Sequence, residues 1–421
     1  MLTQAPKGTK DVLPAESGKW QHIENKVRDI CARFGYREIR TPVFEHTELF
    51  LRGVGDTTDI VQKEMFTFTD KGDRSITLKP EGTAGAVRAF IENSLYGGPQ
   101  PTKMYYLSSP IFRQEKPQAG RLREHHQFGV EVFGAPGPSV DVEVISVALT
   151  LLRELGVNGL ALNINSIGCP VCRPAYNAAL RTFLENKSGG LCGNCKERMQ
   201  TNPLRVLDCK EEACKELVKD APVMLDCLCD DCRTHFDGLK ARLEALGIEY
   251  AVNPHIVRGL DYYTKTVFEI ISTDIGSQGT VCGGGRYDGL VEQLGGPSMP
   301  GIGFGMGIER LLLVLNSLGI ELPQPRVCDA YICTLGGEAS VKGLVIASCL
   351  RDSGIRADID HMGRSLKAQL KYAAKLGAAY VVILGENELQ NGIAAVRNMS
   401  ASEEKMVPLA ELNEYLKAGL Q

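Results

Sequence analysis

Apolar residues recur every three or four positions near the start of the chain, which predicts an amphipathic helix over residues 18–34. Trp20, Ile23 and Val27 lie on its apolar face, and Gly35 ends it. Short stretches that favour strands follow, separated by turns rich in Gly, Pro and Asp. The predicted strands cover residues 38–42, 65–69, 75–79, 103–108, 127–133 and 160–166, and the predicted helices cover residues 83–93 and 140–155.

The pattern resumes after a cysteine-rich stretch. Predicted helices cover residues 236–246 and 306–318, and predicted strands cover residues 250–254, 267–271 and 280–283. Many short strands with few helices favour a large antiparallel sheet with helices on one side. Strands and helices alternate beyond Pro323–Pro325, at residues 330–334, 341–352, 357–359, 365–376 and 380–384. This alternation predicts a small α/β domain with a partly parallel sheet.

The composition is that of an ordinary globular protein, with 43% hydrophobic and 23% charged residues among 421. It excludes a disordered chain, a collagen-like chain and a small disulfide scaffold. Apolar runs such as residues 378–384 fall short of the roughly 20 residues that a membrane span needs. Residues 1–11 are polar and carry no secretory signal. We therefore expect a cytoplasmic protein with no membrane partner; its net charge of −4 leaves local nucleic-acid contacts open.

Nine of the 14 cysteines lie between Cys169 and Cys232. Three pairs have C-x-x-C spacing: Cys169 and Cys172, Cys192 and Cys195, and Cys229 and Cys232. Two such pairs complete a four-cysteine Zn2+ site, which is structural because it leaves no open ligand position. Free thiols in a small helical insert are the alternative. His235 is either a further ligand or a surface histidine at the start of a helix.

Two motifs combine basic residues with glycines. In Phe112–Glu115, Arg113 offers a rigid fork for a phosphate, and Glu115 points to the same side of a strand. The surrounding residues 103–125 carry five basic and two acidic residues, so we expect a polyanion there rather than a plain hairpin. In Gly301–Arg310, glycines permit a close backbone approach to a ligand, but the spacing fits neither a P-loop nor a dinucleotide fingerprint. A glycine-rich strand packed on a helix is the alternative.

Two further motifs combine tyrosines or acids with charged residues. Arg258–Thr264 has adjacent tyrosines, and Gly283–Asp288 follows; both favour a pocket for a flat ligand over a surface turn. In Lys79–Thr83, Glu81 and Thr83 lie at a helix entrance. A helix cap is the simpler interpretation, and an ammonium-binding site is the alternative.

These motifs, in this order, resemble those of the class II aminoacyl-tRNA synthetases, and specifically the histidyl-tRNA synthetase family. The resembling segments are residues 7–11 (the N-terminal opening), 37–42 (motif 1, at the dimer interface), 112–131 (motif 2), 301–310 (motif 3), and 258–263 with 283–288 (the histidine signatures). The resemblance implies an α+β fold, with an antiparallel sheet flanked by helices and a C-terminal α/β domain that binds the anticodon. It implies a catalytic core at 1–167 and 237–322, a Cys-rich helical insertion at 168–236 and the anticodon-binding domain at 326–421.

The resemblance also implies a two-step reaction by a homodimer. ATP, bound with Mg2+, and L-histidine form histidyl-adenylate, and the histidyl group then passes to tRNA(His). Arg113 and Arg258 would supply charge at the α-phosphate. The remaining implied nucleotide contacts are Glu115 (adenine), His125 (at the position where the family usually has an aromatic stacking residue) and Arg310 (γ-phosphate). The implied histidine contacts are Glu81, Thr83 and Gln127 around the ammonium group, Glu131 and Tyr263 at the imidazole, and Tyr262 and Tyr287 lining its pocket.

Three other functions compete with this interpretation. A non-catalytic regulatory subunit of ATP phosphoribosyltransferase has the same core, but such proteins typically lose the Arg258 signature and the C-terminal domain. A synthetase for threonine, proline or glycine also lacks that signature. A purely RNA-binding module would not need Arg113 and Arg310. The cysteines are not a general feature of the family, and the segment from Arg326 onward has 11 basic and 11 acidic residues, so anticodon binding there rests on the resemblance.

Overall fold

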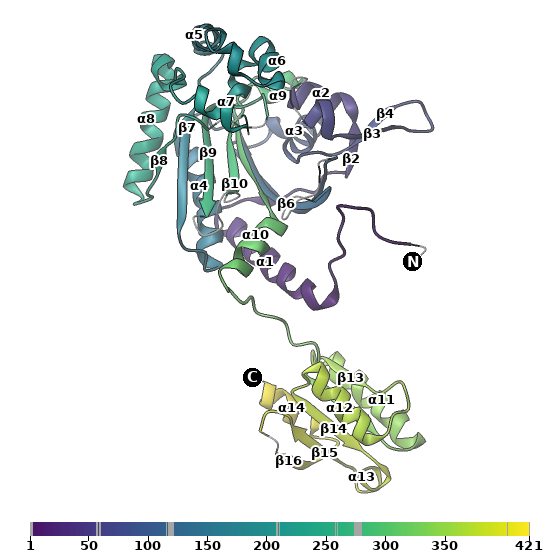
Figure 1. Ribbon diagram of the computed structural model, residues 1–421. Helices are drawn as coiled ribbons and strands as arrows, with labels where there is room; N and C mark the ends of the chain where they lie inside the picture. Colours follow the sequence, from purple (N-terminus) through teal and green to yellow (C-terminus); the bar gives the residue numbers. More distant parts are fainter. Residues whose placement is uncertain are drawn as a thin grey trace. The chain divides into compact units, whose positions relative to one another are not determined.

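The chain folds into two compact units, residues 1–322 and residues 323–421. Figure 1 shows the computed structural model. The structure describes residues 3–55, 58, 60–114, 116, 122–207, 209, 211–256, 258, 260–272, 280–401 and 403–420. Pro323–Pro325, where the sequence pattern changes, lies at the start of the second unit.

The first unit is built on an eight-stranded sheet with the order β1-β5-β6-β11-β10-β9-β7-β8. The strands are β1 (Arg37–Glu38), β5 (Thr102–Phe112), β6 (Glu124–Phe133), β7 (Leu160–Ser166), β8 (Ala251–Val252), β9 (Thr264–Ser272), β10 (Thr280–Arg286) and β11 (Gly301–Gly307). The six inner strands pair antiparallel, which confirms the predicted α+β class. The short edge strands β1 and β8 add parallel pairs.

Helices pack against one face of this sheet, as the sequence predicts (Figure 1). They are α1 (Pro14–Arg33), α4 (Pro138–Glu154), α8 (Asp230–Ala245) and α10 (Ile308–Ser317). Side chains alternate between the two faces of a strand. Phe128, Val130 and Val132 of β6 therefore all enter the helix-side core. The intervening residues of β6 face the other way, where the candidate site lies.

Shorter elements cover part of the opposite face. They are α2 (Thr47–Val54), α3 (Thr83–Glu92), α9 (Leu290–Gln293), the π-helix η1 (Ile60–Glu64), the 3-10 helix η2 (Leu95–Gly97) and the small sheet of β2 (Phe44–His46), β4 (Ser75–Leu78) and β3 (Phe66–Thr69). Their apolar residues form a second cluster, in which Val87 and Phe90 of α3 pack with Phe133 and with the signature residues Tyr262 and Tyr287. This packing brings the histidine signatures next to the start of α3.

The cysteine-rich stretch is helical and has an apolar cluster of its own, including Tyr176, Leu180 and Leu184. Its elements are α5 (Arg173–Glu185), η3 (Ser188–Gly190), α6 (Gly193–Thr201), η4 (Pro203–Val206), α7 (Glu212–Leu217) and η5 (Met224–Cys227). Helix α8 begins at Asp230, six residues before the predicted start. It therefore contains both Cys232 and His235.

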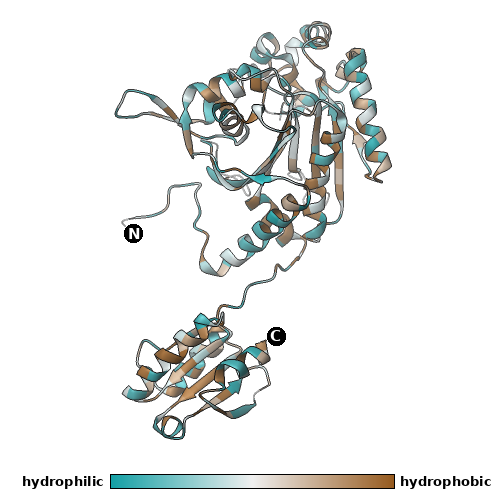
Figure 2. Ribbon diagram, turned by 180° about the vertical axis from the view of Figure 1, so that it is seen from behind, coloured by the Kyte–Doolittle hydropathy of each residue, from teal (hydrophilic) through white to brown (hydrophobic). Residues whose placement is uncertain are grey.

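The second unit has a five-stranded sheet with the order β13-β12-β14-β15-β16. The elements are β12 (Ala330–Thr334), α11 (Gly337–Asp352), β13 (Ala357–Ile359), α12 (Leu366–Leu376), β14 (Tyr380–Leu384), α13 (Glu386–Gln390), β15 (Ile393–Asn398), β16 (Glu404–Pro408) and α14 (Leu412–Leu420). β13, β12 and β14 are parallel, whereas β15 and β16 extend the sheet antiparallel. The strands of this unit are mostly hydrophobic in colour in Figure 2. The sequence analysis missed β15 and β16; β16 is exposed at four of its five residues and so offers no apolar run.

Within the described ranges, no helix combines the length and the apolar character that a membrane crossing requires.

Candidate active site

Glu131 of β6 is the centre of a buried cluster of hydroxyl groups. Its side chain is fully buried. Thr83 Oγ1 donates to Glu131 Oε1 at 2.8 Å, Tyr106 OH donates to the same oxygen at 3.3 Å, and Tyr287 OH donates to Oε2. Burial raises the pKa of the Glu131 carboxyl to about 8. The carboxyl lies at the edge of a tyrosine-lined region.

Glycines of β11 make room for the side chains of β6. Gly303 lies directly opposite Glu131 in the antiparallel register. A Cβ at Gly303 would overlap Glu131 Oε2, and a Cβ at Gly305 would overlap the Gln127 amide. The Gly301–Gly307 motif is thus a strand that precedes a helix, as its structural interpretation predicts. Its glycines nevertheless serve the site, because they leave the space that the polar residues of β6 occupy.

Three tyrosines from the histidine signatures pack together beside Glu131, one pair of rings tilted and the other T-shaped. The rings of Tyr262 and Tyr263 are 4.7 Å apart, and those of Tyr262 and Tyr287 are 5.7 Å apart. All three are at least nine-tenths buried. Tyr262 OH also donates to Glu81 Oε2 at 3.4 Å. The structure therefore brings together the acids and tyrosines that the sequence assigns to histidine binding.

Glu81 caps helix α3. Its carboxylate accepts the backbone N–H of Thr83 at 2.9 Å and that of Ala84 at 2.6 Å, which confirms the cap. Burial raises the pKa of Glu81, while those two backbone donors oppose the rise. The preceding Lys79 is also buried, and it donates to Ser109 Oγ at 2.6 Å. The Lys79–Thr83 motif is therefore a rigid, largely buried corner of the site.

Two arginines are held by neighbouring groups. Arg113 follows directly after β5; its Nε donates to the Pro80 carbonyl at 2.8 Å, and its guanidinium lies 3.7 Å from the Glu64 carboxylate. Arg258 is paired with Glu269 of β9 and lies over Gly283 of β10, where a Cβ would overlap the guanidinium. Both side chains keep about a quarter of their surface exposed, at 25% and 22%. Each arginine is thus positioned and still accessible to a ligand.

The remaining predicted ligand-binding residues share strand β6 or its neighbours. His125 and Gln127 follow the same alternation as Glu131 and so point to the same face. Gln127 Oε1 is buried and accepts no hydrogen bond within the described part of the chain. Arg310 lies in the first turn of α10 and donates to a backbone carbonyl of β10 at 2.9 Å. Glu115 lies outside the described residues.

His126 points to the helix side of the sheet, away from His125. Its ring contacts Trp20 edge-on at 5.1 Å between centroids, and its Nδ1 lies 2.8 Å from Glu309 Oε1. The hydrogen bond with Glu309 raises the pKa of His126. The two adjacent histidines therefore do not form a joint metal site, as the strand pattern predicts.

Comparison with known proteins places this geometry in a family. The family model described as Histidyl-tRNA synthetase matches residues 8–311, and that described as Anticodon binding domain matches residues 329–419. A protein from Caldanaerobacter subterraneus subsp. tengcongensis named histidine–tRNA ligase is 61% identical over 417 residues, covering 99% of this chain and all of that protein. The chain belongs to the histidyl-tRNA synthetase family.

Two further comparisons agree over the full length. A histidine–tRNA ligase from Clostridioides difficile is 56% identical over 421 residues and is covered completely. The crystal structure of apo S. aureus histidyl-tRNA synthetase matches with a TM-score of 0.85 at 41% identity, covering 99% of this chain and all of that one. These matches support the histidyl-tRNA synthetase interpretation and not the regulatory alternative. They also confirm the C-terminal α/β anticodon-binding domain.

The insertion cysteines gather differently from the single zinc site that the spacing predicts. Cys169, Cys172, Cys229 and Cys232 form one set of four. Cys192 and Cys195 form a second set with Cys209 and Cys214, whose C-x-x-x-x-C spacing the sequence analysis overlooked. All six cysteines that the spacing singles out as candidate ligands lie in these sets, but they divide between two places.

The predictions for His235 were wrong, both as a metal ligand and as a surface residue. His235 is buried, and its Nε2 lies 2.7 Å from Asp141 Oδ2. Asp141 also pairs with Arg286 of β10 at 2.7 Å, and both side chains are completely buried. The acidic partner lies on α4, far away in the sequence, so nothing near His235 revealed this cluster.

Tyr106 is the site residue that sequence reasoning missed. It lies on β5 opposite Gly129 of β6, and a Cβ at Gly129 or at Gly82 would overlap its ring. Glycines in two separate motifs thus surround one buried tyrosine. A glycine two positions before Glu131 on the same strand face was the available signal, but its meaning depends on the β5–β6 register.

Proposed function

We propose that the protein charges tRNA(His) with L-histidine in two steps, as a homodimer in the cytoplasm. The histidine carboxylate attacks the α-phosphate of ATP, the bond to the β-phosphate oxygen breaks, and pyrophosphate leaves. The 3'-terminal ribose hydroxyl of the tRNA then takes the histidyl group and releases AMP. Mg2+ enters with ATP as part of the substrate complex, because its hard oxygen ligands are the phosphates.

The observation that carries this proposal is the buried Glu131 carboxyl among hydroxyl donors beside the tyrosines. An imidazole has two nitrogens that form hydrogen bonds in one plane. Glu131 would pair with one of them and Tyr263 would contact the ring, while Tyr262 and Tyr287 line the pocket. A buried acid rejects side chains that lack the matching nitrogen, because its own hydrogen-bonding group would then remain unpaired.

The substrate ammonium group would bind beside Glu81 and Thr83. The Glu81 carboxyl is buried at a corner of the site, and Gln127 Oε1 is a buried acceptor that makes no hydrogen bond among the described residues. Buried acceptors of this kind are rare unless a ligand completes them. Together they favour a cationic group of the substrate at this position.

Arg113 and Arg258 would stabilise the negative charge that develops at the α-phosphate. Guanidinium groups held before the reaction cost little reorganisation when the transition state forms. Glu269 holds Arg258, and the Pro80 carbonyl holds Arg113. The nucleotide would also contact Glu115 at its adenine, His125 at its ring face and Arg310 at its γ-phosphate.

The proposed division of labour follows the chain. Residues 1–167 and 237–322 would form the catalytic core, 168–236 the insertion that contacts the acceptor arm, and 326–421 the part that binds the anticodon. We also propose that thiolates of the insertion bind structural Zn2+, because closed thiolate sets are typical of zinc in a reducing compartment.

The test is ATP–pyrophosphate exchange by the purified full chain, with each of the 20 standard amino acids added separately. Exchange with L-histidine alone, followed by histidine transfer to tRNA(His), is the expected result. Exchange with threonine, proline or glycine would assign another synthetase. No exchange with any amino acid, from folded protein, would favour the non-catalytic regulatory alternative.

A further inference from the structure

Eight of the nine insertion cysteines form two separate four-sulfur sets. The terminal set is Cys169, Cys172, Cys229 and Cys232, and the inner set is Cys192, Cys195, Cys209 and Cys214. Within each set the sulfur atoms all lie within 4.8 Å of one another. Cys227 lies in the same stretch and belongs to neither set, so closeness in sequence alone does not explain the grouping.

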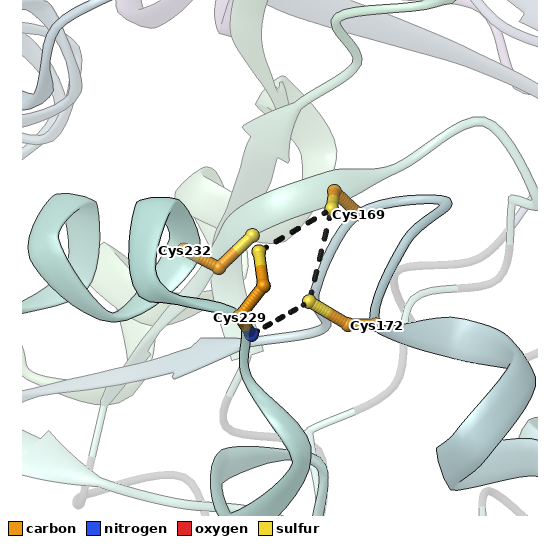
Figure 3. A group of neighbouring side chains, drawn as sticks. All are labelled: Cys169, Cys172, Cys229 and Cys232. Atoms are coloured by element: carbon orange, nitrogen blue, oxygen red, sulfur yellow. Dashed lines mark hydrogen bonds between the residues drawn. The ribbon is translucent and has the colours of Figure 1, made fainter.

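The sulfur spacing fits a tetrahedral metal site and not a disulfide. Cys169 Sγ lies 3.7 Å from Cys172 Sγ and 3.8 Å from Cys229 Sγ, and Figure 3 shows the four side chains of the terminal set converging. In the inner set, Cys192 Sγ lies 3.9 Å from Cys209 Sγ. A tetrahedron with Zn–S bonds of about 2.3 Å has S···S edges of about 3.8 Å. A disulfide needs about 2.05 Å.

The backbone around both sets donates to sulfur. The N–H of Cys229 lies 3.2 Å from Cys172 Sγ, and the N–H of Cys192 lies 3.3 Å from Cys214 Sγ. Such donors stabilise negative charge on a thiolate and orient it toward a metal. Four thiolates that converge in a largely buried place need a cation between them, and a divalent ion with soft ligands suits that need.

The terminal set closes the insertion at its two ends. Cys169 and Cys172 lie between β7 and α5, and Cys229 and Cys232 lie at the N-cap and in the first turn of α8. Gly168 joins the set to β7 in a left-handed conformation (φ 65°), where a side chain would collide with Cys172. The inner set instead joins the start of α6 to Cys209 and to α7, inside the insertion.

Residues next to both sets contact the backbone or side chains of the Arg258 signature. The Arg173 guanidinium, directly after Cys172, donates to the Tyr263 carbonyl. Asn202 Nδ2 donates to Asp261 Oδ1 at 3.0 Å.

Arg205 is also buried, and it donates to the Arg258 carbonyl at 3.3 Å. Asn202 and Arg205 both lie between the inner-set residues Cys195 and Cys209. A cavity of about 210 Å³ lies between these insertion residues and the signature.

We propose that the insertion binds two Zn2+ ions, one in each set, and that they hold Arg173, Asn202 and Arg205 against the histidine-activating residues. Only the second part of this proposal, the positioning of the histidine-activating residues, rests on the proposed function. The first part, the binding of two Zn2+ ions, does not. The insertion would then position Arg258, Asp261 and Tyr263 for the first reaction step, besides any contact with tRNA. Arg173, Asn202 and Arg205 are positioning residues, since each acts through a residue of the signature.

The metal count tests the first part. Elemental analysis of the purified full chain should give two zinc ions per chain. Cys232→Ser and Cys214→Ser should each lower the count to one, and the matched control Cys227→Ser should leave two. A wild-type count of one or none, or a loss in the control, would overturn the two-site assignment.

A spectroscopic measurement keeps this part testable if a serine variant fails to fold. Wild-type protein produced with Co2+ in place of zinc should show the absorption of two tetrahedral four-sulfur cobalt centres per chain. Intensity for a single centre, or the weak bands of oxygen-ligated cobalt, would contradict the proposal. This readout does not depend on any amino-acid activity.

The second part is tested by Asn202→Ala, with the exposed Asn186→Ala in the same insertion as its control. Asn202→Ala should keep two zinc ions and raise the KM for histidine in pyrophosphate exchange about tenfold, with the KM for ATP changed less than twofold. Asn186→Ala should change neither. An unchanged KM for histidine in Asn202→Ala would refute the positioning role, whereas absence of histidine exchange in the wild type would refute the proposed function itself.

Discussion

Gly303 of β11 and Glu131 of β6 lie directly opposite each other, and the missing side chain of the glycine leaves the space that the Glu131 carboxyl fills. The glycine-rich segment Gly301–Gly307 thus makes room for the carboxyl at the centre of the candidate site. Gly283 makes room in the same way, because a Cβ there would overlap the Arg258 guanidinium. Both relationships join segments more than 20 residues apart into one site.

Gly303→Ala should displace Glu131 and weaken histidine binding. The new Cβ overlaps both a carboxylate oxygen and the Val130 carbonyl, so neither neighbour has room to accommodate it. We expect the KM for histidine to rise at least about 100-fold and the free energy of unfolding to fall by about 1–3 kcal/mol. Gly289→Ala, whose Cβ would meet no atom within 4 Å, is the control. Equal KM values for the two variants would contradict the assignment of Glu131.

Histidine affinity should depend on the ionisation of Glu131. The pKa of about 8 means that the free protein carries a proton on this carboxyl below pH 8. The imidazole of free histidine is neutral above about pH 6.5. Between pH 6.5 and 8 the protonated Glu131 carboxyl therefore binds a neutral imidazole, and the two groups share one proton. Above pH 8 that proton is lost before binding, and the KM for histidine should rise about tenfold per pH unit.

Glu131→Gln removes the titrating group and supplies the control for that profile. The variant should bind histidine more weakly at pH 7, and the ratio of its KM to the wild-type KM should shrink as pH rises above 8. The amino group of free histidine titrates identically in both assays, so dividing one KM by the other removes its effect. A ratio that stays constant from pH 6.5 to 9.5 would show that Glu131 does not set the pH dependence.

Arg258→Ala should strongly slow adenylate formation while leaving ATP binding largely intact. The guanidinium lies among the histidine signatures, so its charge is expected at the α-phosphate rather than at the adenine. Loss of one preorganised donor of this kind lowers kcat by about 100- to 1,000-fold. Single-turnover pyrophosphate release measures the step, and equilibrium dialysis with ATP measures binding. Near-normal turnover would remove Arg258 from the catalytic group.

Local patterns in the sequence predicted most elements of the sheet, whereas the residues of the candidate site were named from the family resemblance. The strands at 160–166, 330–334, 357–359 and 380–384 match the structure residue for residue. The antiparallel pairing of β5 with β6 and of β9 with β10 follows from their short connections. The pairs β6 with β11 and β7 with β9 instead join distant parts of the chain. Tyr106 escaped prediction because its role depends on the register between β5 and β6, which the pattern does not define.

Contacts between residues far apart in the sequence explain the other differences between the predictions and the structure. Asp141, His235 and Arg286 meet only because α4, α8 and β10 pack together, so His235 looked like a lone histidine near cysteines. The C-x-x-C spacing singled out six cysteines that lie in the two sets, but it could not show that Cys209 and Cys214 complete the second set. A C-x-x-x-x-C spacing is uninformative until the helices that carry it are placed.

The buried cluster of Asp141, His235 and Arg286 should be a major source of stability. Asp141→Ala would leave the fully buried Arg286 guanidinium without the carboxylate that lies 2.7 Å away. Breaking a buried pair in this way costs about 3–5 kcal/mol, measurable by urea unfolding at pH 7. The exposed Asp237→Ala on α8, which breaks only a surface pair with Lys240, should cost less than about 1 kcal/mol.

The difference in the free energy of unfolding between wild type and Asp141→Ala should depend on pH, in a direction set by the pKa shift of Asp141. Burial alone would raise the pKa of Asp141, but the hydrogen bond from His235 and the charge of Arg286 together lower it below its ordinary value. A lowered folded-state pKa contributes stability above the unfolded value of about 3.9, and that contribution disappears as pH falls through the folded value. The gap between wild type and Asp141→Ala should therefore be constant from pH 6 to 8 and narrow only below about pH 4. A gap that narrows already between pH 7 and 5 would show that the cluster is held by a different ionisation.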